Sequence, residues 1–124
     1  MMATLPALLL VVCGGGLGAG LRFLTGVVLS ASIGSPWSTM LVNLAGSFLI
    51  GLLAGTQVGS EWYESFGKHF LVTGVLGGFT TYSAFALDSV QLLAEGRLFL
   101  GLVYAVGTAV GCIVAAWLGL RLGS

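Results

Sequence analysis

The sequence predicts an all-α membrane protein with four transmembrane helices. Hydrophobic residues make up 57% of the chain and charged residues only 6%, and the mean hydropathy is +1.10. Soluble globular domains carry about 25% charged residues. Four apolar stretches are each long enough to cross a hydrocarbon core of about 30 Å. Because these stretches use almost the whole chain, we expect residues 1–124 to form a single transmembrane domain without a soluble catalytic part.

The boundaries of the four spans follow from apolar runs that short polar turns separate. The spans are expected at residues 5–29, 37–58, 69–93 and 98–122. The loop at 59–68 combines acidic and aromatic residues, a composition typical of the membrane–water interface. The N-terminus has no basic region before its apolar run, so we expect the first span to be retained.

The basic residues are divided equally between the two ends of the predicted bundle. Lys68 and Arg121 belong to one side, and Arg22 and Arg97 belong to the other. Under the positive-inside rule this balance gives no preferred orientation. Such a chain can insert both ways, so two opposite copies can pair as an antiparallel, dual-topology homodimer. Four helices also enclose too little space for a protein-lined pathway, which favours an oligomer.

Composition also limits the classes of function. The formal net charge is zero, which argues against a nucleic-acid partner. The sequence has no nucleophile motif, acid–base pair or cofactor motif, so we expect that it is not an enzyme. Cys13 and Cys112 fit no disulfide framework and are expected to be buried thiols that pack as small hydrophobic groups.

Glycine is unusually frequent, with 21 residues. Glycines four residues apart let membrane helices approach closely. We therefore expect a tightly packed bundle with little free cavity, suited to a narrow path for a small solute. The pairs are Gly14/Gly18, Gly16/Gly20, Gly51/Gly55, Gly74/Gly78 and Gly107/Gly111.

The third span contains a poor helix interior at residues 77–83, Gly-Gly-Phe-Thr-Thr-Tyr-Ser. Each glycine costs about 1 kcal/mol relative to alanine inside a helix. The segment predicts a helix break, whose free carbonyls can coordinate a cation. Unwound backbone at that depth must face protein or water. The alternative is a continuous helix whose glycines serve packing.

Polar and aromatic side chains recur at helical spacing in the later spans. Tyr82 and Phe85 share a helix face, and the positive edges of their rings would favour an anion, although packing is the alternative. The amide of Asn43 offers two donors, and a role as interhelical hydrogen-bond partner is the alternative. Arg22 and Asp88 are charges near membrane depth and hence functional candidates. The polar stripes are Thr39/Asn43/Ser47 and Tyr104/Thr108/Cys112.

Three segments resemble the Fluc (CrcB) family of fluoride channels. They are residues 15–23 (GGLGAGLRF), 39–46 (TMLVNLAG) and 77–85 (GGFTTYSAF), and the likeness covers nearly the whole chain in order. The resemblance implies a dual-topology homodimer with two antiparallel fluoride pores and one central structural sodium ion. It also implies passive export of fluoride across the cytoplasmic (inner) membrane of a microbe.

The resemblance assigns roles to particular residues. It places the carbonyls of Gly77 and Thr80 on the sodium ion and Arg22 as the arginine of the first helix. With Tyr104 of the same polar stripe, the pore candidates are Asn43, Tyr82, Ser83, Phe85, Tyr104, Thr108 and Cys112. The chain departs from the family pattern in having Tyr82 for phenylalanine, Ala84 and Cys112 for hydroxyl residues, and Asp88 for glutamate.

These observations predict a fluoride-selective passive channel whose partners are the fluoride ion, a second copy of the chain and membrane lipid. One alternative is a proton-coupled transporter of the small multidrug type, which is also a four-helix dual-topology dimer. That mechanism needs a membrane-embedded carboxylate in the first helix, whereas this helix carries Arg22 and no acid. A further alternative is a non-conducting subunit that assembles with a paralogous chain.

Overall fold

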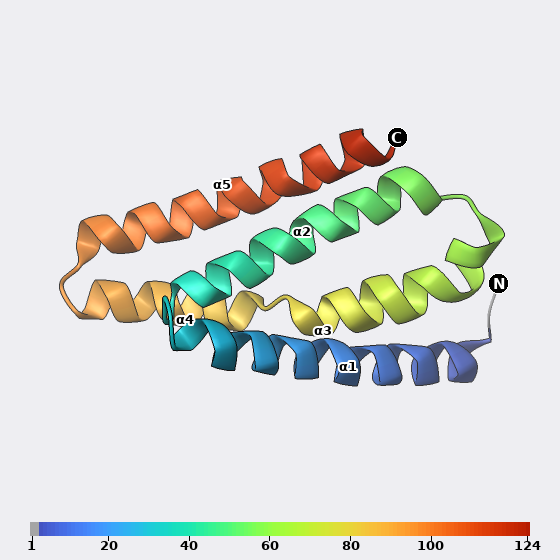
Figure 1. Cartoon of the computed structure of the whole chain (residues 1–124), viewed down its shortest axis with the longest axis horizontal. Helices are drawn as coiled ribbons and strands as arrows, with labels where there is room; N and C mark the ends of the chain where they lie inside the picture. Colours follow the sequence, from blue (N-terminus) through green and yellow to red (C-terminus); the bar gives the residue numbers. More distant parts are fainter. Residues whose placement is uncertain (1–2) are drawn as a thin grey trace.

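The computed structural model describes residues 3–124, and these residues form four membrane-length helical spans (Figure 1). All four spans are long and apolar enough to cross a membrane. The prediction of an all-helical chain with four such spans is confirmed. The elements are α1 (Thr4–Ser30), α2 (Trp37–Gln57), the π-helical segment η1 (Tyr63–Leu76), α3 (Gly77–Phe79), α4 (Tyr82–Ala94) and α5 (Leu98–Gly123).

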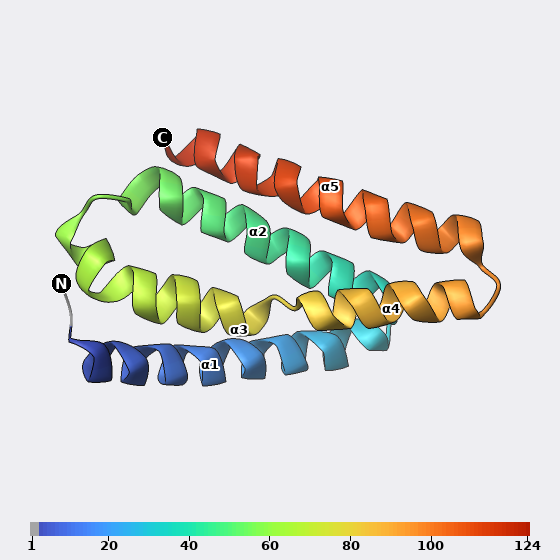
Figure 2. The same cartoon turned by 180° about the vertical axis from the view of Figure 1, so that it is seen from behind.

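The spans run alternately up and down, as both views show (Figures 1 and 2). The start of α1, the α2–η1 connection and the C-terminus lie at one end of the bundle. The α1–α2 and α4–α5 turns lie at the other end, and each contains a glycine in the left-handed region, Gly34 at φ +67° and Gly96 at φ +76°. Glycine suits these positions because it has no Cβ to clash there.

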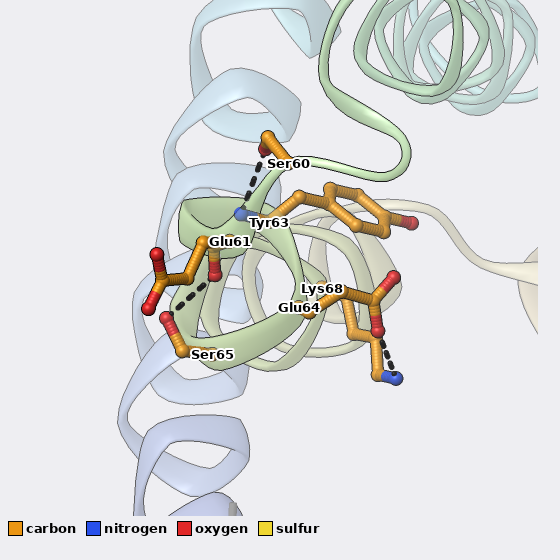
Figure 3. A network of polar contacts seen from close by, with 6 residues as sticks. All are labelled: Ser60, Glu61, Tyr63, Glu64, Ser65 and Lys68. Atoms are coloured by element: carbon orange, nitrogen blue, oxygen red, sulfur yellow. Dashed lines mark hydrogen bonds and ion pairs between the residues drawn. The ribbon is translucent and has the colours of Figure 1, made fainter. Parts of the chain in front are cut away.

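The third span begins earlier than the sequence analysis predicted. Its helix is already formed at Tyr63, whereas residues 59–68 were expected to be a loop. Figure 3 shows why: the Ser60 Oγ accepts a hydrogen bond from the Tyr63 N–H at 3.1 Å, and Lys68 pairs with Glu64 one turn away at 2.9 Å. A serine cap and an (i, i+4) ion pair both favour helix. The Ser65 Oγ also donates to a backbone carbonyl one turn earlier.

The closest helix packing occurs in two pairs, α1 with η1–α3 and α2 with α5. In the first pair, a Cβ on Gly18 would overlap the carbonyl oxygen of Val75, and a Cβ on Gly74 would lie 2.9 Å from the Cα of Gly14. In the second pair, a Cβ on Gly51 would overlap the carbonyl oxygen of Ala116. Three of the predicted glycine pairs therefore make the expected close contacts: Gly14/Gly18, Gly51/Gly55 and Gly74/Gly78.

The other two predicted glycine pairs do not pack helices together within the described chain. A Cβ on Gly16, Gly20 or Gly107 would meet nothing within 4 Å, and one on Gly111 would meet only a methyl group of Leu44. Two cavities of about 470 and 510 Å³ are open at the surface of the single chain, so the expectation of little free cavity in the assembled protein stays a prediction. Close glycine contact is confined to the two helix pairs, which leaves these open spaces between them.

Most large apolar side chains are exposed on the single chain, and among residues 3–124 the buried apolar core consists of Val42, Leu76, Leu92 and Tyr104. Such side chains are suited to lipid, which provides no hydrophobic drive for burying them. The expectation of two buried thiols is wrong for Cys13, which is exposed, while Cys112 is half-buried. Cys13 is exposed because α1 packs through its glycines, not through the face that carries the thiol.

Candidate functional site

The third span is interrupted near its middle by two residues with extended backbone. Thr80 has φ −81° and ψ 156°, and Thr81 has φ −148° and ψ 114°. α3 ends at Phe79 and α4 begins at Tyr82, and the gap between them is visible in both views (Figures 1 and 2). The helix therefore stops within the segment whose two glycines and two threonines are poor helix formers.

The side chain of Asn43 on α2 holds the backbone of this interruption. Its Oδ1 accepts a hydrogen bond from the Thr81 N–H at 2.8 Å, and its Nδ2 donates to the Thr81 carbonyl at 3.0 Å. This pair of bonds fixes the orientation of the amide. In an inverted amide, the Nδ2 group would face the Thr81 N–H, and the Oδ1 atom would face the Thr81 carbonyl oxygen. One hydrogen of the Asn43 Nδ2 group takes no part in this pair and is still available.

The carbonyls of Gly77 and Thr80 are among those that lose their helical donors at the interruption. In a continuous helix, the Thr81 N–H would bond to the Gly77 carbonyl and the Ala84 N–H to the Thr80 carbonyl. Here the Thr81 N–H bonds to Asn43, and the Ala84 N–H bonds to the Thr81 Oγ1 at 3.2 Å. Within the described chain neither helical bond is made. These two carbonyls belong to the residues that the family resemblance assigns to sodium.

Arg22 lies beside the same interruption, on α1. Its Nε donates a hydrogen bond to the carbonyl of Gly78 at 3.1 Å, in the last turn before the helix stops. A cation at the C-terminal end of a helix satisfies an orphan carbonyl and interacts favourably with the helix dipole. Arg22 also lines the cavity of about 510 Å³, together with Ser38 and Thr39.

The cavity of about 470 Å³ lies between α2, the third span and α5 and collects most of the candidate residues. Its aromatic wall is formed by Tyr82 and Phe85, whose ring centroids are 5.7 Å apart at an interplanar angle of 67°. Phe85 also contacts Tyr104 on α5 at a centroid distance of 5.6 Å. The candidates that line the cavity are Asn43, Gly77, Thr80, Tyr82, Phe85, Thr108 and Cys112.

Three buried polar atoms near this wall have no hydrogen-bond partner among the described residues: the Thr108 Oγ1, the Tyr104 hydroxyl and the Asp88 Oδ2. Thr108 is only 3% exposed and lines the cavity. The other oxygen of Asp88 accepts a hydrogen bond from the Ser35 Oγ at 2.9 Å. A buried polar group without a partner costs about 1–3 kcal/mol, so such atoms indicate a place where water or a ligand completes the bonding.

Not every predicted residue lines the main cavity. Ser83 is exposed, and its Oγ lies 3.3 Å from the Thr81 Oγ1. Arg22 lines the other cavity, and Asp88 is hydrogen-bonded to Ser35 in the α1–α2 turn without lining either cavity. Sequence reasoning missed Thr81 itself, whose side chain caps α4. A threonine directly before an apolar run is a recognised cap signal, and this signal was available in the sequence.

The unpaired hydroxyl of Thr108 gives a testable prediction. Replacing Thr108 with valine keeps the shape of the side chain and removes an orphan buried oxygen, so thermal stability in detergent should be unchanged or higher. If the hydroxyl faces a permeating anion, anion efflux from proteoliposomes should fall about tenfold, which corresponds to ~1.4 kcal/mol of barrier. Lower stability with normal flux would mean that the hydroxyl has a structural partner instead.

Fold and site together define a small multi-pass membrane protein with a mostly apolar, aromatic-walled cavity between its helices. The chain belongs to the family described as CrcB-like protein, Camphor Resistance (CrcB), whose profile matches residues 9–120. This result confirms the family resemblance seen in the sequence.

Relatives with similar sequences come from several bacteria. The chain is 44% identical over 117 residues to "Fluoride-specific ion channel FluC" of Rhizobium meliloti (strain 1021), covering 93% of this chain and 94% of the relative. It is 43% identical over 116 residues to "Fluoride-specific ion channel FluC 2" of Rhodococcus jostii (strain RHA1), covering 94% and 97%. It is 45% identical over 116 residues to the FluC protein of Agrobacterium fabrum, covering 92% and 93%. These names describe channels, a class that is not enzymatic, so the expectation that this chain is not an enzyme holds.

Proposed function

We propose that this protein is a fluoride-selective passive ion channel. The observation that carries the proposal is the main cavity, which Thr108, Asn43 and Phe85 from three different spans line together. Fluoride is small and strongly hydrated, so a selective path must replace its water with donors while still allowing exit. Hydroxyl and amide donors and positive ring edges meet this need without the deep well of a lysine.

The proposed assembly is an antiparallel homodimer with two pores, placed in the cytoplasmic (inner) membrane, where it would let fluoride leave the cell. Its support is the equal division of basic residues between the two ends of the bundle. Outward-facing glycines that meet nothing within 4 Å, such as Gly20 and Gly107, leave smooth surfaces on which a second copy can pack. Such a dimer would also cover part of the exposed apolar surface.

The carbonyls of Gly77 and Thr80 fit the sodium ion that the family implies. Both have lost their helical donors at the interruption, so two copies of the chain would supply four oxygen ligands. Carbonyl oxygen is a ligand type suited to a hard cation. The ion would contribute positive charge that compensates the converging carbonyl dipoles. It would have a structural role and stabilise the assembled dimer by mass action.

No observation favours the proton-coupled transporter. That mechanism requires a carboxylate in the first span, and residues 4–30 contain no acidic side chain. Purified protein in potassium fluoride-loaded liposomes separates the possibilities, with fluoride efflux recorded by a selective electrode after valinomycin is added. Rapid fluoride efflux without chloride efflux is expected. No fluoride efflux from dimeric protein would contradict the channel, and uptake of a cationic drug driven by a proton gradient would support the transporter.

Dual orientation gives a separate prediction. A single cysteine added after Ser124, in a Cys13→Ser, Cys112→Ser background, should react with an impermeant thiol reagent from both sides of the membrane. About half of the copies should be labelled from each side, because the basic residues balance. Two lysines added beside that cysteine should shift labelling strongly to one side. Labelling from only one side in the unmodified chain would contradict the antiparallel dimer.

A further inference from the structure

We infer that Asn43 and Thr81 are positioning residues that keep the carbonyls of Gly77 and Thr80 free, because they give substitute acceptors to the Thr81 and Ala84 N–H groups, the helical donors of those two carbonyls. This inference rests on the proposed function for the identity of the cation. It assigns to Asn43 a role in addition to that of a donor inside a pore. It also gives a role to Thr81, which the family resemblance did not assign.

The first substitution concerns Gly77. The Thr81 N–H is the natural helical donor to its carbonyl, and the structure gives that N–H to the Asn43 Oδ1 at 2.8 Å. The Asn43 Nδ2 holds the Thr81 carbonyl at 3.0 Å, so the bond pair keeps this backbone unit extended from both sides. Asn43 is only 8% exposed, and hydrogen bonds are electrostatically stronger in such a site than in water.

The second substitution concerns Thr80. Its helical donor is the Ala84 N–H, which bonds instead to the Thr81 Oγ1 at 3.2 Å as the N-terminal cap of α4. The bonds on either side of the interruption stay helical: the Thr80 N–H still donates to the Leu76 carbonyl at 3.0 Å. The helical donors of Gly77 and Thr80 are therefore both redirected to side-chain acceptors.

Neither of these two donors is left unpaired, which lowers the cost of the interruption within a membrane. Unpaired N–H groups in hydrocarbon are costly, so a bare break would tend to close into helix. Without the Asn43 amide, the Thr81 N–H has an acceptor available in the Gly77 carbonyl. Closing the helix would then remove that oxygen from cation binding. The same reasoning links the Thr81 hydroxyl to the Thr80 carbonyl.

The test uses the full-length purified dimer and variants Asn43→Ala, Thr81→Ala, Thr81→Ser and Ser47→Ala. Ser47 is the matched control, since it lies one turn from Asn43, lines the same cavity and makes no hydrogen bond to the interruption in the described residues. Thr81→Ser keeps a capping hydroxyl. The measured quantity is the sodium concentration that gives half of the maximal thermal stabilisation. Fluoride efflux is recorded separately.

In the wild-type protein, sodium should raise the melting temperature. Asn43→Ala and Thr81→Ala should each raise the sodium midpoint by about tenfold, whereas Thr81→Ser and Ser47→Ala should stay within about twofold of wild type. If Asn43→Ala does not assemble, the sodium midpoint of Thr81→Ala decides the inference. A wild-type sodium midpoint in the alanine variants overturns the inference, even where fluoride efflux is lost, because Asn43 would then act on the anion alone.

A wild-type dimer that does not respond to sodium would refute the sodium part of the proposed function. The inference is then decided by the distance between spin labels at Lys68→Cys and Val90→Cys, on either side of the interruption, in a background without native cysteines. Labelled chains are diluted with unlabelled chains. Closing two extended residues into helix shortens the span by about 4 Å. Shortening in Asn43→Ala, but not in Ser47→Ala, supports the inference, and an unchanged distance overturns it.

Discussion

Replacing Phe85 with isoleucine is expected to reduce fluoride efflux from proteoliposomes by about tenfold to a hundredfold, a barrier increase of ~1.4–2.7 kcal/mol. Isoleucine keeps an apolar side chain of similar bulk but has no ring edge for the anion. It also breaks the run of aromatic contacts from Tyr82 through Phe85 to Tyr104. The dimer should still assemble, because Phe85 is only half-buried and lies outside the close glycine contacts. Size-exclusion chromatography checks assembly.

The matched control is Tyr82→Phe. This substitution keeps the ring that contacts Phe85 and removes only a hydroxyl, and it restores the pattern of the family. Its efflux should therefore stay close to that of the unmodified chain. Near-normal efflux in Phe85→Ile would mean that the anion passes elsewhere. Lost efflux in Tyr82→Phe would show that the tyrosine hydroxyl has become a ligand, most simply in place of the hydroxyl absent at Ala84.

Replacing Gly18 with alanine is expected to destabilise the folded protein by about 3 kcal/mol, near the upper end of the usual cost of overpacking. A Cβ at this position would overlap the Val75 carbonyl oxygen and lie 2.9 Å from the Phe79 backbone nitrogen. Both are backbone atoms of the third span, so they cannot move aside as a flexible side chain would. α1 would have to shift away from η1 and α3, just before the interruption.

Gly20→Ala is the control for that substitution. It lies on the same helix, and its added Cβ would meet nothing within 4 Å. Both changes raise helix propensity equally, so any difference in thermal stability in detergent reports packing. Gly18→Ala should unfold or aggregate at a clearly lower temperature than Gly20→Ala. Equal melting temperatures would mean that contact between α1 and the third span does not limit stability.

Hydropathy and turn chemistry determined the four spans, because a run of about 20 apolar residues in a lipid environment has few alternatives to a helix. Glycine and proline likewise placed the turns between the first two and the last two spans. The predicted start of the third helix was too late in the sequence. The cap at Ser60 and the pair Glu64–Lys68 that extend this helix are local polar contacts within a segment whose composition is typical of an interfacial loop. Apolar content alone does not detect such contacts.

The glycine pairs show where sequence reasoning reaches its limit. Every pair has the same spacing, yet Gly14/Gly18 packs against backbone while Gly16/Gly20 meets nothing. The two pairs lie on different faces of one helix, and only tertiary structure decides which face meets a neighbour. The same cause leaves the two open cavities on the single chain, because close contact on two pairs of helices leaves space between the pairs.

For the candidate site, the sequence by itself determined which residues carry the chemistry: a poor helix former at residues 77–83, polar stripes on α2 and α5, and a pair of aromatic rings one turn apart on α4. Tertiary structure alone decided how these groups are connected. The bonds from Asn43 to Thr81 join residues 38 positions apart, and the Arg22–Gly78 bond joins residues 56 apart. Helical periodicity fixes neighbours only within a few turns of one helix. Which distant backbone group a buried amide or guanidinium satisfies depends on how the helices pack.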